Sequence, residues 1–428
     1  MKILFCSPLL AYEGHFARET GMKSVVLADT GLDVTILGFP GTLNEAPDHP
    51  RVRYISVQAG WSMEKKKRVQ TWRRKWRNWW LFIVEIWWVH WFAFRYAAQQ
   101  KYDLIYISEV DPWLLIPELL LARLLGRWTP VVGLIPYIYY GKSTVLHKLR
   151  ITTRIRGRLN QWSARWLPFC MNLICGSETE RRYLFSYRLD RVHVIYEGFK
   201  RPARIWSKTE ARQRLGLPAG RRILLLFGLA SYAKGSDLLM NAIEGMPPVF
   251  DICMVGKVGG QNQSSWGADR FRGTEWEKHL HVVSRFVTEE EKCLYFSACD
   301  AVIVPYRFGF MMISGMVLDA IAFGKALIAC DQFEIGRYTR DYCLGLLFKT
   351  EDVADLRRAL DEFSAKPDAW FEEIGRHCRA VADEFSMPNV GRRYRQFFAS
   401  VLERGKPGSA GALRPGEQTP DGGRRTTD

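Results

Sequence analysis

The segment AVIVPYRFGFMMISGMVLDAIAFGKALIA (residues 301–329) contains two short apolar runs separated by a turn and a helical pattern. The first run predicts a buried strand, Ser314 is a favourable helix N-cap, and the second run, beginning at Lys325, predicts the next strand. A strand, a helix and a strand in this order form a βαβ unit, whose two strands are parallel. The segment therefore predicts a parallel sheet with helices on its faces.

The same alternation continues in both directions along the chain. In the second half, further strands are predicted at residues 223–228, 250–257, 281–286 and 345–349. In the first half the predicted strands are Lys2–Ser7, Asp33–Gly38, Val52–Val57, Asp103–Ser108, Pro130–Ile135, Leu173–Gly176 and Val192–Tyr196. We therefore predict an α/β chain of two Rossmann-like domains, each a doubly wound parallel sheet, that face each other across a cleft.

Breaks in this pattern predict the domain boundaries. We expect an N-terminal domain over residues 1–200, a linker at 201–221 that contains Pro202, Pro218 and Gly220, and a second domain over 222–386. Residues 387–403 are expected to form a closing amphipathic helix that crosses back to the first domain. Residues 404–428 are rich in Gly, Pro and polar side chains, and we expect them to be disordered.

The charge of the chain is unevenly distributed. There are 61 Lys and Arg residues against 45 Asp and Glu residues, a net charge of +16. Residues 61–100 hold nine basic and two acidic side chains, and residues 141–166 hold seven basic and no acidic ones. Such local basicity predicts an anionic partner. The nine cysteines include no C-x-x-C pair, which argues against a disulfide scaffold and a structural zinc site.

The turns after the strands at 223–228 and 301–306 carry residues suited to a diphosphate. A helix start at Ser314-Gly315 offers backbone N–H groups and the positive end of the helix dipole. Lys234 and Arg307, on neighbouring loops, could neutralise the same diphosphate, and Asp319 could accept hydrogen bonds from a ribose. A Ser-Gly helix start is often only a cap, so the prediction depends on the order of these residues within one domain.

At these residues the chain resembles the family 4 glycosyltransferases, which have the GT-B fold. The resemblance extends over residues 1–402 and is strong over 222–350. It implies that a nucleotide-sugar donor binds the second domain and an acceptor binds the first. Lys234, in a K-G turn, would then bind the diphosphate, and Asp319, in LDAIAFGKALIA, would replace a ribose-binding glutamate. The donor site implied in this way comprises Gly14, Gly228, Lys234, Gly235, Arg307, Ser314, Gly315 and Asp319.

Two positions depart from the family pattern. The first motif glutamate of the family falls on Met311, and the arginine of its G-R-L element falls on Leu229. The Ser314-Gly315 pair and the sequence P-Y-R, which ends in Arg307, resemble a branch of the family with an S-G helix start. These departures weaken the assignment of the donor sugar more than that of the nucleotide diphosphate.

The chain contains no D-x-D sequence, so we expect no metal and no other cofactor at the diphosphate. The resemblance implies a retaining transfer in which Lys234 and Arg307 stabilise the leaving group. Two alternatives remain open. One is a soluble nucleotide-sugar epimerase or phosphorylase with the same fold. The other is an inactive scaffold that binds membrane and nucleotide, which the missing carboxylate at Met311 would explain.

Candidate acceptor-side residues follow two strands of the first domain. Gly14 and His15 lie in the turn after the first strand, where His15 could contact the donor or accept the proton of the acceptor. It could equally cap the helix that begins at Phe16. Glu109 and Asp111 follow the strand at 103–108 and could act as a base or be solvated turn residues. Gly176, Ser177 and Glu178 are expected to form a helix cap and its partner for the helix dipole.

Residues 61–100 contain half of the sixteen tryptophans of the chain. In a helix, Trp72, Trp76 and Trp79 would share one stripe with basic residues between them, a pattern typical of helices that lie in a membrane interface. The residues predicted to contact an anionic membrane are Trp72, Trp76, Trp79, Trp80, Arg73, Arg74 and Arg77.

Other interpretations of these basic segments are open. A spanning helix at 79–98 would place Glu85 and Arg95 in the bilayer, at a cost of about 3 kcal/mol each. The helix could also pack internally against its own sheet. The cluster at 141–166 could extend the cationic face or be a solvated helix. No nucleic-acid-binding module is recognisable, so we expect no nucleic-acid partner.

Together these features predict a retaining, metal-independent glycosyltransferase. It would transfer a sugar from a nucleoside-diphosphate sugar to a lipid-linked or saccharide acceptor. The N-terminus, MKILFCSPLL, is expected to be a strand rather than a secretory signal. We therefore expect a cytoplasmic protein, peripheral on the inner face of the cytoplasmic membrane, in envelope or exopolysaccharide synthesis.

Overall fold

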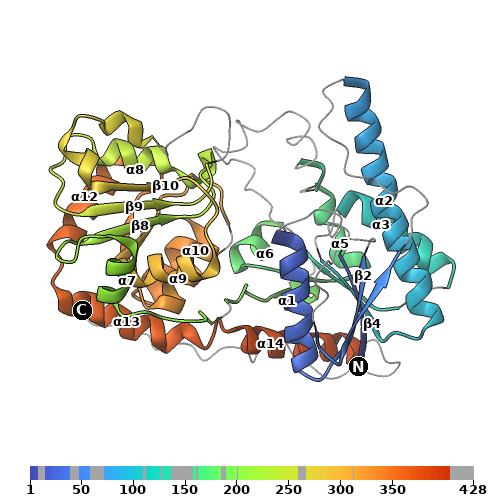
Figure 1. Cartoon of the computed structure of the whole chain (residues 1–428). Coiled ribbons are helices and arrows are strands. Elements are labelled where there is room, and N and C mark those ends of the chain that lie inside the picture. The colour runs from blue at the N-terminus through green and yellow to red at the C-terminus, as the bar shows by residue number, and fades with distance from the viewer. Residues whose placement is uncertain are drawn as a thin grey trace, which may run out of the picture.

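The computed structural model contains two α/β domains (Figure 1). The structure describes residues 1–7, 15–38, 48–57, 72–108, 112–126, 129–135, 158–160, 162–184, 189–199, 201–258, 267–311 and 313–404. The tail predicted to be disordered, residues 404–428, lies outside the described residues except for Arg404. Arg404 is helical and ends the last helix.

The first domain is built on a parallel sheet with the strand order β3-β2-β1-β4-β5-β6-β7. Its strands are β1 (Lys2–Cys6), β2 (Asp33–Gly38), β3 (Val52–Ser56), β4 (Leu104–Ile107), β5 (Val131–Leu134), β6 (Asn172–Cys175) and β7 (Val192–Val194). Its helices are α1 (His15–Asp29), α2 (Trp72–Gln99), α3 (Pro112–Leu124), α5 (Leu167–Cys170) and α6 (Glu178–Leu184). All seven predicted strands of this half are confirmed.

The second domain has a parallel sheet with the order β10-β9-β8-β11-β12-β13. The strands are β8 (Ile223–Phe227), β9 (Asp251–Val255), β10 (Leu280–Val283), β11 (Ala301–Val304), β12 (Ala326–Cys330) and β13 (Gly345–Phe348). The helices are α7 (Lys208–Leu215), α8 (Ser236–Ile243), α9 (Glu289–Ala298), α10 (Gly315–Phe323), α11 (Phe333–Asp341), α12 (Val353–Ala365) and α13 (Asp368–Ala382). The predicted strands and the predicted fold class are confirmed.

Each sheet changes its winding direction at one place. In the first sheet β1 lies between β2 and β4, and in the second β8 lies between β9 and β11. In open parallel sheets, ligands bind outside the carboxyl ends of the strands at such a switch point. The turns after β8 and β11 are therefore the part of the second domain to examine for a ligand.

The C-terminal helix α14 (Met387–Arg404) follows the second domain and packs on the first, as predicted (Figure 1). Tyr394 and Phe398 lie in the core beneath the first sheet, with their ring centroids 5.7 and 5.5 Å from that of Tyr106. Gly391 permits this close approach, because a Cβ there would lie 2.6 Å from Val26 of α1. The core on this face of the first sheet is thus completed by α14.

Helix α2 packs internally over its second half. Its buried side chains Val89, Ala93, Phe94 and Ala97 follow a helical spacing against the first sheet. The fully buried His90 Nδ1 lies 2.7 Å from Glu118 Oε2 of α3, and burial raises the pKa of that carboxyl.

The remaining faces of α2 differ from this packed stripe. Trp87 and Trp88 are exposed to solvent, and the beginning of the helix extends beyond the body of the domain (Figure 1). The side chains of the seven predicted membrane residues, Trp72 to Trp80, lie outside the description. Within the described part of the chain, no helix has the length and apolar character needed to cross a bilayer.

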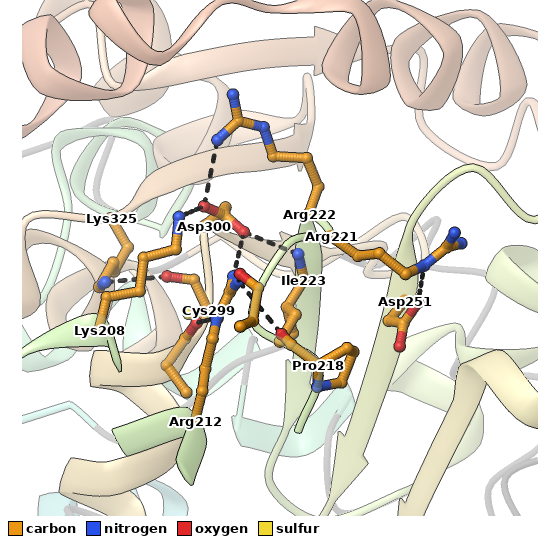
Figure 2. A network of polar contacts seen from close by, with 12 residues as sticks. Lys208, Arg212, Pro218, Arg221, Arg222, Ile223, Asp251, Cys299, Asp300 and Lys325 are labelled. Atoms are coloured by element: carbon orange, nitrogen blue, oxygen red, sulfur yellow. Dashed lines mark hydrogen bonds and ion pairs between the residues drawn. The ribbon is translucent and has the colours of Figure 1, made fainter. Parts of the chain in front are cut away.

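Part of the expected linker is helical. Ser207 caps α7 by accepting a hydrogen bond from the Glu210 N–H (3.2 Å), and Gly216 ends the helix with φ 65°. Arg212 of α7 reaches into the second domain, where its Nη2 lies 2.8 Å from Asp300 Oδ2 (Figure 2). Helix α7 therefore belongs to the second domain.

Asp300, directly before β11, organises the amino ends of the second sheet (Figure 2). Its side chain is 2 % exposed, and its Oδ2 accepts a hydrogen bond from the Ile223 N–H at 2.7 Å. Arg212, Lys208 and Arg222 all pair with the same carboxylate. Because these contacts lie at the amino ends of the strands, they stabilise the domain at the edge opposite the switch point.

We predict that Asp300→Asn destabilises the protein by about 3–5 kcal/mol, because it leaves the buried Arg212 guanidinium without its counter-charge. Chemical denaturation followed by circular dichroism measures this change. The matched control is Asp368→Asn, which removes an 81 % exposed carboxylate that pairs with Arg222, and little change is expected there. Equal effects of the two substitutions would contradict a structural role for the buried network.

Candidate functional site

The K-G turn after β8 is held against the exit of β11. Residues Tyr232–Lys234 form a single 3-10 turn, and Gly235 follows with φ 65°. A Cβ at Gly235 would lie 1.9 Å from the Pro305 carbonyl oxygen, so only glycine fits there. The Arg307 N–H also donates to the Ala233 carbonyl at 3.0 Å. The predicted residues of the two loops therefore lie side by side.

Gly228 serves the same edge of the sheet. It directly follows β8 with φ 113°, and the neighbouring Gly256 packs so closely that a Cβ there would lie 1.9 Å from the Gly228 carbonyl oxygen. The backbone conformation and the close packing of the two turns therefore explain why glycine occupies both positions.

Helix α10 begins as predicted. Ser314 is its N-cap, and its hydroxyl accepts a hydrogen bond from the Met316 N–H at 3.2 Å. At Gly315 a Cβ would meet no described atom within 4 Å, so space is open above the first turn. A helix start with open space beside its first N–H groups suits an anion.

A tyrosine that the sequence did not single out connects these two elements. The Lys234 ammonium donates a hydrogen bond to the Tyr306 hydroxyl, which lies 2.7 Å from the Ser314 Oγ. Lys234 Nζ also lies 3.8 Å from the centroid of the Tyr306 ring. Among the described residues, no carboxylate lies within ion-pair distance of Lys234, so none of these residues compensates its charge.

Arg307 has different surroundings from those expected for a free cation. Its guanidinium pairs with Asp237 of α8 and with Glu351 (Nη1 to Oε1, 2.8 Å), and its Nε donates to the Tyr232 carbonyl at 3.1 Å. The side chain is buried among these partners. Arg307 therefore fixes the K-G turn through its contacts with protein groups.

Asp319 lies on α10 and pairs with Lys292 of α9 at 2.7 Å (Nζ to Oδ1). Burial raises the pKa of the Asp319 carboxyl, and the Lys292 ammonium opposes this shift. A ribose hydroxyl at this carboxylate would therefore share it with Lys292.

The two departures from the family pattern have clear positions. Met311 is buried in the interior, so no carboxylate occupies its place. Leu229 is exposed directly after β8. At the ends of β9 and β10 lie Lys257 and Phe286, with the Lys257 Nζ 5.3 Å from the Phe286 ring centroid, and the Phe286 side chain is largely exposed.

The predicted acceptor-side residues are only partly described. The backbone of His15 begins α1, directly after the turn that follows β1, and its side chain lies outside the description, as do Gly14, Glu109 and Asp111. Among the described residues, no group of three or more His, Cys, Asp or Glu side chains could hold a metal ion.

The carboxyl edges of the two sheets meet between α6 and α11. The Thr179 hydroxyl of α6 donates to Glu334 Oε1 of α11 at 2.9 Å. The predicted cap is confirmed, because Ser177 Oγ accepts a hydrogen bond from the Glu180 N–H at 2.9 Å. Burial raises the pKa of Glu180 to about 8, although its carboxylate accepts a hydrogen bond from the Gly176 N–H.

Comparison with known proteins agrees with this architecture. Residues 207–376 match the family model described as Glycosyl transferases group 1. A D-inositol 3-phosphate glycosyltransferase of Nocardioides sp. is 27 % identical over 260 residues, which are 54 % of this chain and 55 % of that protein. One of Streptosporangium roseum is 25 % identical over 247 residues, with the same shares. The chain thus spans about half the length of these curated relatives.

Solved structures are similar over nearly the whole chain. Sucrose-phosphate synthase of Thermosynechococcus elongatus has a TM-score of 0.67 at 19 % identity and covers 94 % of this chain and 100 % of its own. HepE of Anabaena in complex with UDP has a TM-score of 0.67 at 16 % identity, with the same coverage. These likenesses establish the fold. Residues 207–376 are therefore similar to the Glycosyl transferases group 1 family, and the chain that contains them has the GT-B fold.

Proposed function

We propose that this protein is a glycosyltransferase that binds a nucleoside-diphosphate sugar at the carboxyl ends of β8 and β11. The observation that carries the proposal is the placement of Lys234, uncompensated by any described carboxylate, beside the start of α10 in a group 1 domain. Fixed positive charge and a helix start at one place are suited to a diphosphate leaving group.

In the proposed reaction the bond between the sugar C1 and the diphosphate oxygen breaks, and a bond forms between C1 and an acceptor hydroxyl oxygen. Lys234 and the first turn of α10 stabilise the charge that develops on the diphosphate. The acceptor proton passes to the leaving oxygen or to a base near the end of the first sheet, for which His15, Glu109 and Asp111 are candidates. We propose retention of configuration and no metal.

The nucleobase is proposed to bind beside Phe286 at the end of β10. Phe286 is 73 % exposed, and an exposed ring beside a lysine offers a stacking face for a base. The HepE structure named above contains UDP, which makes UDP one of the nucleotides to test.

We expect one of UDP, GDP and ADP to bind the purified protein with micromolar affinity in isothermal titration calorimetry. Lys234→Ala should weaken this binding about tenfold or more, because it removes a charge-assisted contact to the diphosphate. The matched control Lys278→Ala, outside the site, should bind normally. If no nucleotide binds, or if both variants bind like the wild type, the proposed donor site is wrong.

The burial of Met311 favours a second candidate, a nucleotide-binding scaffold without turnover. Release of nucleoside diphosphate from the donor sugar distinguishes the two. Extracted membrane lipid tests a lipid-linked acceptor, and D-inositol 3-phosphate tests the acceptor that the curated relatives are named for. Release that depends on an acceptor supports the transferase, whereas nucleotide binding without release supports the scaffold.

We further propose that the first domain docks on the inner face of the cytoplasmic membrane, where the acceptor is lipid-linked or a saccharide of the envelope. The basic, Trp-rich start of α2 supports this, since Trp and Arg favour an anionic lipid interface. The exposed apolar side chains of the same domain add to it. In the described part of the domain these are Val84, Trp87, Trp88, Leu120, Leu121, Leu124, Leu125, Leu159, Trp162, Trp166 and Phe169.

We predict that the full chain co-sediments with vesicles that contain phosphatidylglycerol and less with vesicles of phosphatidylcholine alone. Replacing Trp72, Trp76 and Trp79 together by Ser should reduce binding about tenfold or more, because three interfacial anchors are lost. The matched control is Val249→Ser, which removes an exposed apolar side chain of the second domain. Equal binding by the triple variant and the wild type would contradict docking through α2.

A further inference from the structure

We propose that Tyr306 is the positioning residue of the donor site. Its hydroxyl holds the Lys234 ammonium beside the first turn of α10, so that the lysine and the helix start face the same diphosphate. This inference rests on the proposed function and extends it to a residue outside the family-derived set of site residues.

The contacts of the Tyr306 hydroxyl determine its hydrogen-bond direction. The lysine ammonium can only donate, so the phenolic oxygen accepts from Lys234. Its own proton is then available to Ser314 Oγ, 2.7 Å away, and that oxygen also accepts from the Met316 N–H. One hydroxyl therefore joins the K-G turn to the cap of α10.

A tyrosine suits this position because it is a neutral acceptor. A carboxylate would hold Lys234 equally well but would cancel its charge, as Asp237 and Glu351 do for Arg307. A phenol orients the ammonium and leaves its charge for an anionic ligand. The two cations of the site thus have different roles: Lys234 is available to bind the diphosphate, whereas Arg307 stabilises the K-G turn.

The lysine is also confined by aromatic rings. Its Nζ lies 3.8 Å from the Tyr306 ring centroid and 5.5 Å from that of Phe310, and these two rings pack edge to face at 5.4 Å. A free lysine side chain loses conformational entropy when it is fixed, and here it is ordered before a ligand arrives.

The backbone of Tyr306 is fixed from a third element. The buried Gln332, the N-cap residue of α11, donates from Nε2 to the Tyr306 and Arg307 carbonyl oxygens, both at 3.0 Å. Its Oε1 accepts from the Gly309 N–H at 2.8 Å. Tyr306 itself is 2 % exposed, so its ring has little room to move. The Tyr306 hydroxyl is therefore held in a fixed position, from which it orients the Lys234 ammonium.

The test is a double-mutant cycle with Tyr306→Phe, Lys234→Ala and the double variant, measured by calorimetry with the nucleoside diphosphate that the wild type binds. Tyr306→Phe keeps the ring and removes only the hydroxyl. We expect its affinity to fall about tenfold. In the Lys234→Ala background the same change should have little further effect, since the hydroxyl acts through the lysine.

The control for folding is Tyr342→Phe, which removes a tyrosine hydroxyl bound to Glu384 away from the site and should leave the affinity unchanged. Binding of the corresponding nucleoside, which has no phosphate, should be the same in the wild type and in Tyr306→Phe. Tyr306→Phe that binds the diphosphate like the wild type, or losses that add fully in the double variant, would overturn the positioning role alone. A wild type that binds no nucleoside diphosphate would overturn the proposed donor site and this role together.

Discussion

Packing of the aromatic face of α14 beneath the first sheet is the interaction on which the rest of the structure depends. Tyr394 and Phe398 complete a core whose other walls are strands and α1, although they follow the whole second domain in the chain. The first domain therefore cannot bury the core on this face of its sheet without α14. The same helix ties the two sheets together, and their carboxyl edges meet at the Thr179–Glu334 hydrogen bond. The site beside β8 and β11 lies at one of these edges.

Charge compensation distinguishes the two ends of the second sheet. At the amino ends, Asp300 forms ion pairs with three cations and stabilises the fold. At the carboxyl ends, Arg307 is neutralised by two carboxylates, whereas Lys234 is held by a phenol. A lysine that is ordered without a counter-charge among the described residues is an arrangement that stability alone does not require, and a bound anion would complete it. This contrast supports a diphosphate site on physical grounds, independently of the family match.

Much of the fold could be predicted from the sequence, because buried parallel strands appear as short apolar runs that end at Gly, Pro or Ser. The K-G turn and the Ser314 cap could also be predicted, because each depends only on residues that are neighbours in the chain. The partners of Arg307 were not, since Asp237 and Glu351 lie far from it in the chain. Tyr306 was hidden as the last residue of the apolar run AVIVPY. Helix α7 carried a signal that was missed, the S-x-x-E start at Ser207 followed by Gly216.

A crystal structure of the protein with its nucleoside diphosphate would decide whether the switch point of the second sheet is the donor site. We predict that the diphosphate lies within about 3 Å of Lys234 Nζ and of the Gly315 N–H, with Arg307 still paired to Asp237 and Glu351. A nucleotide bound away from the ends of β8 and β11, or a diphosphate held by Arg307 while Lys234 makes no contact, would contradict this assignment.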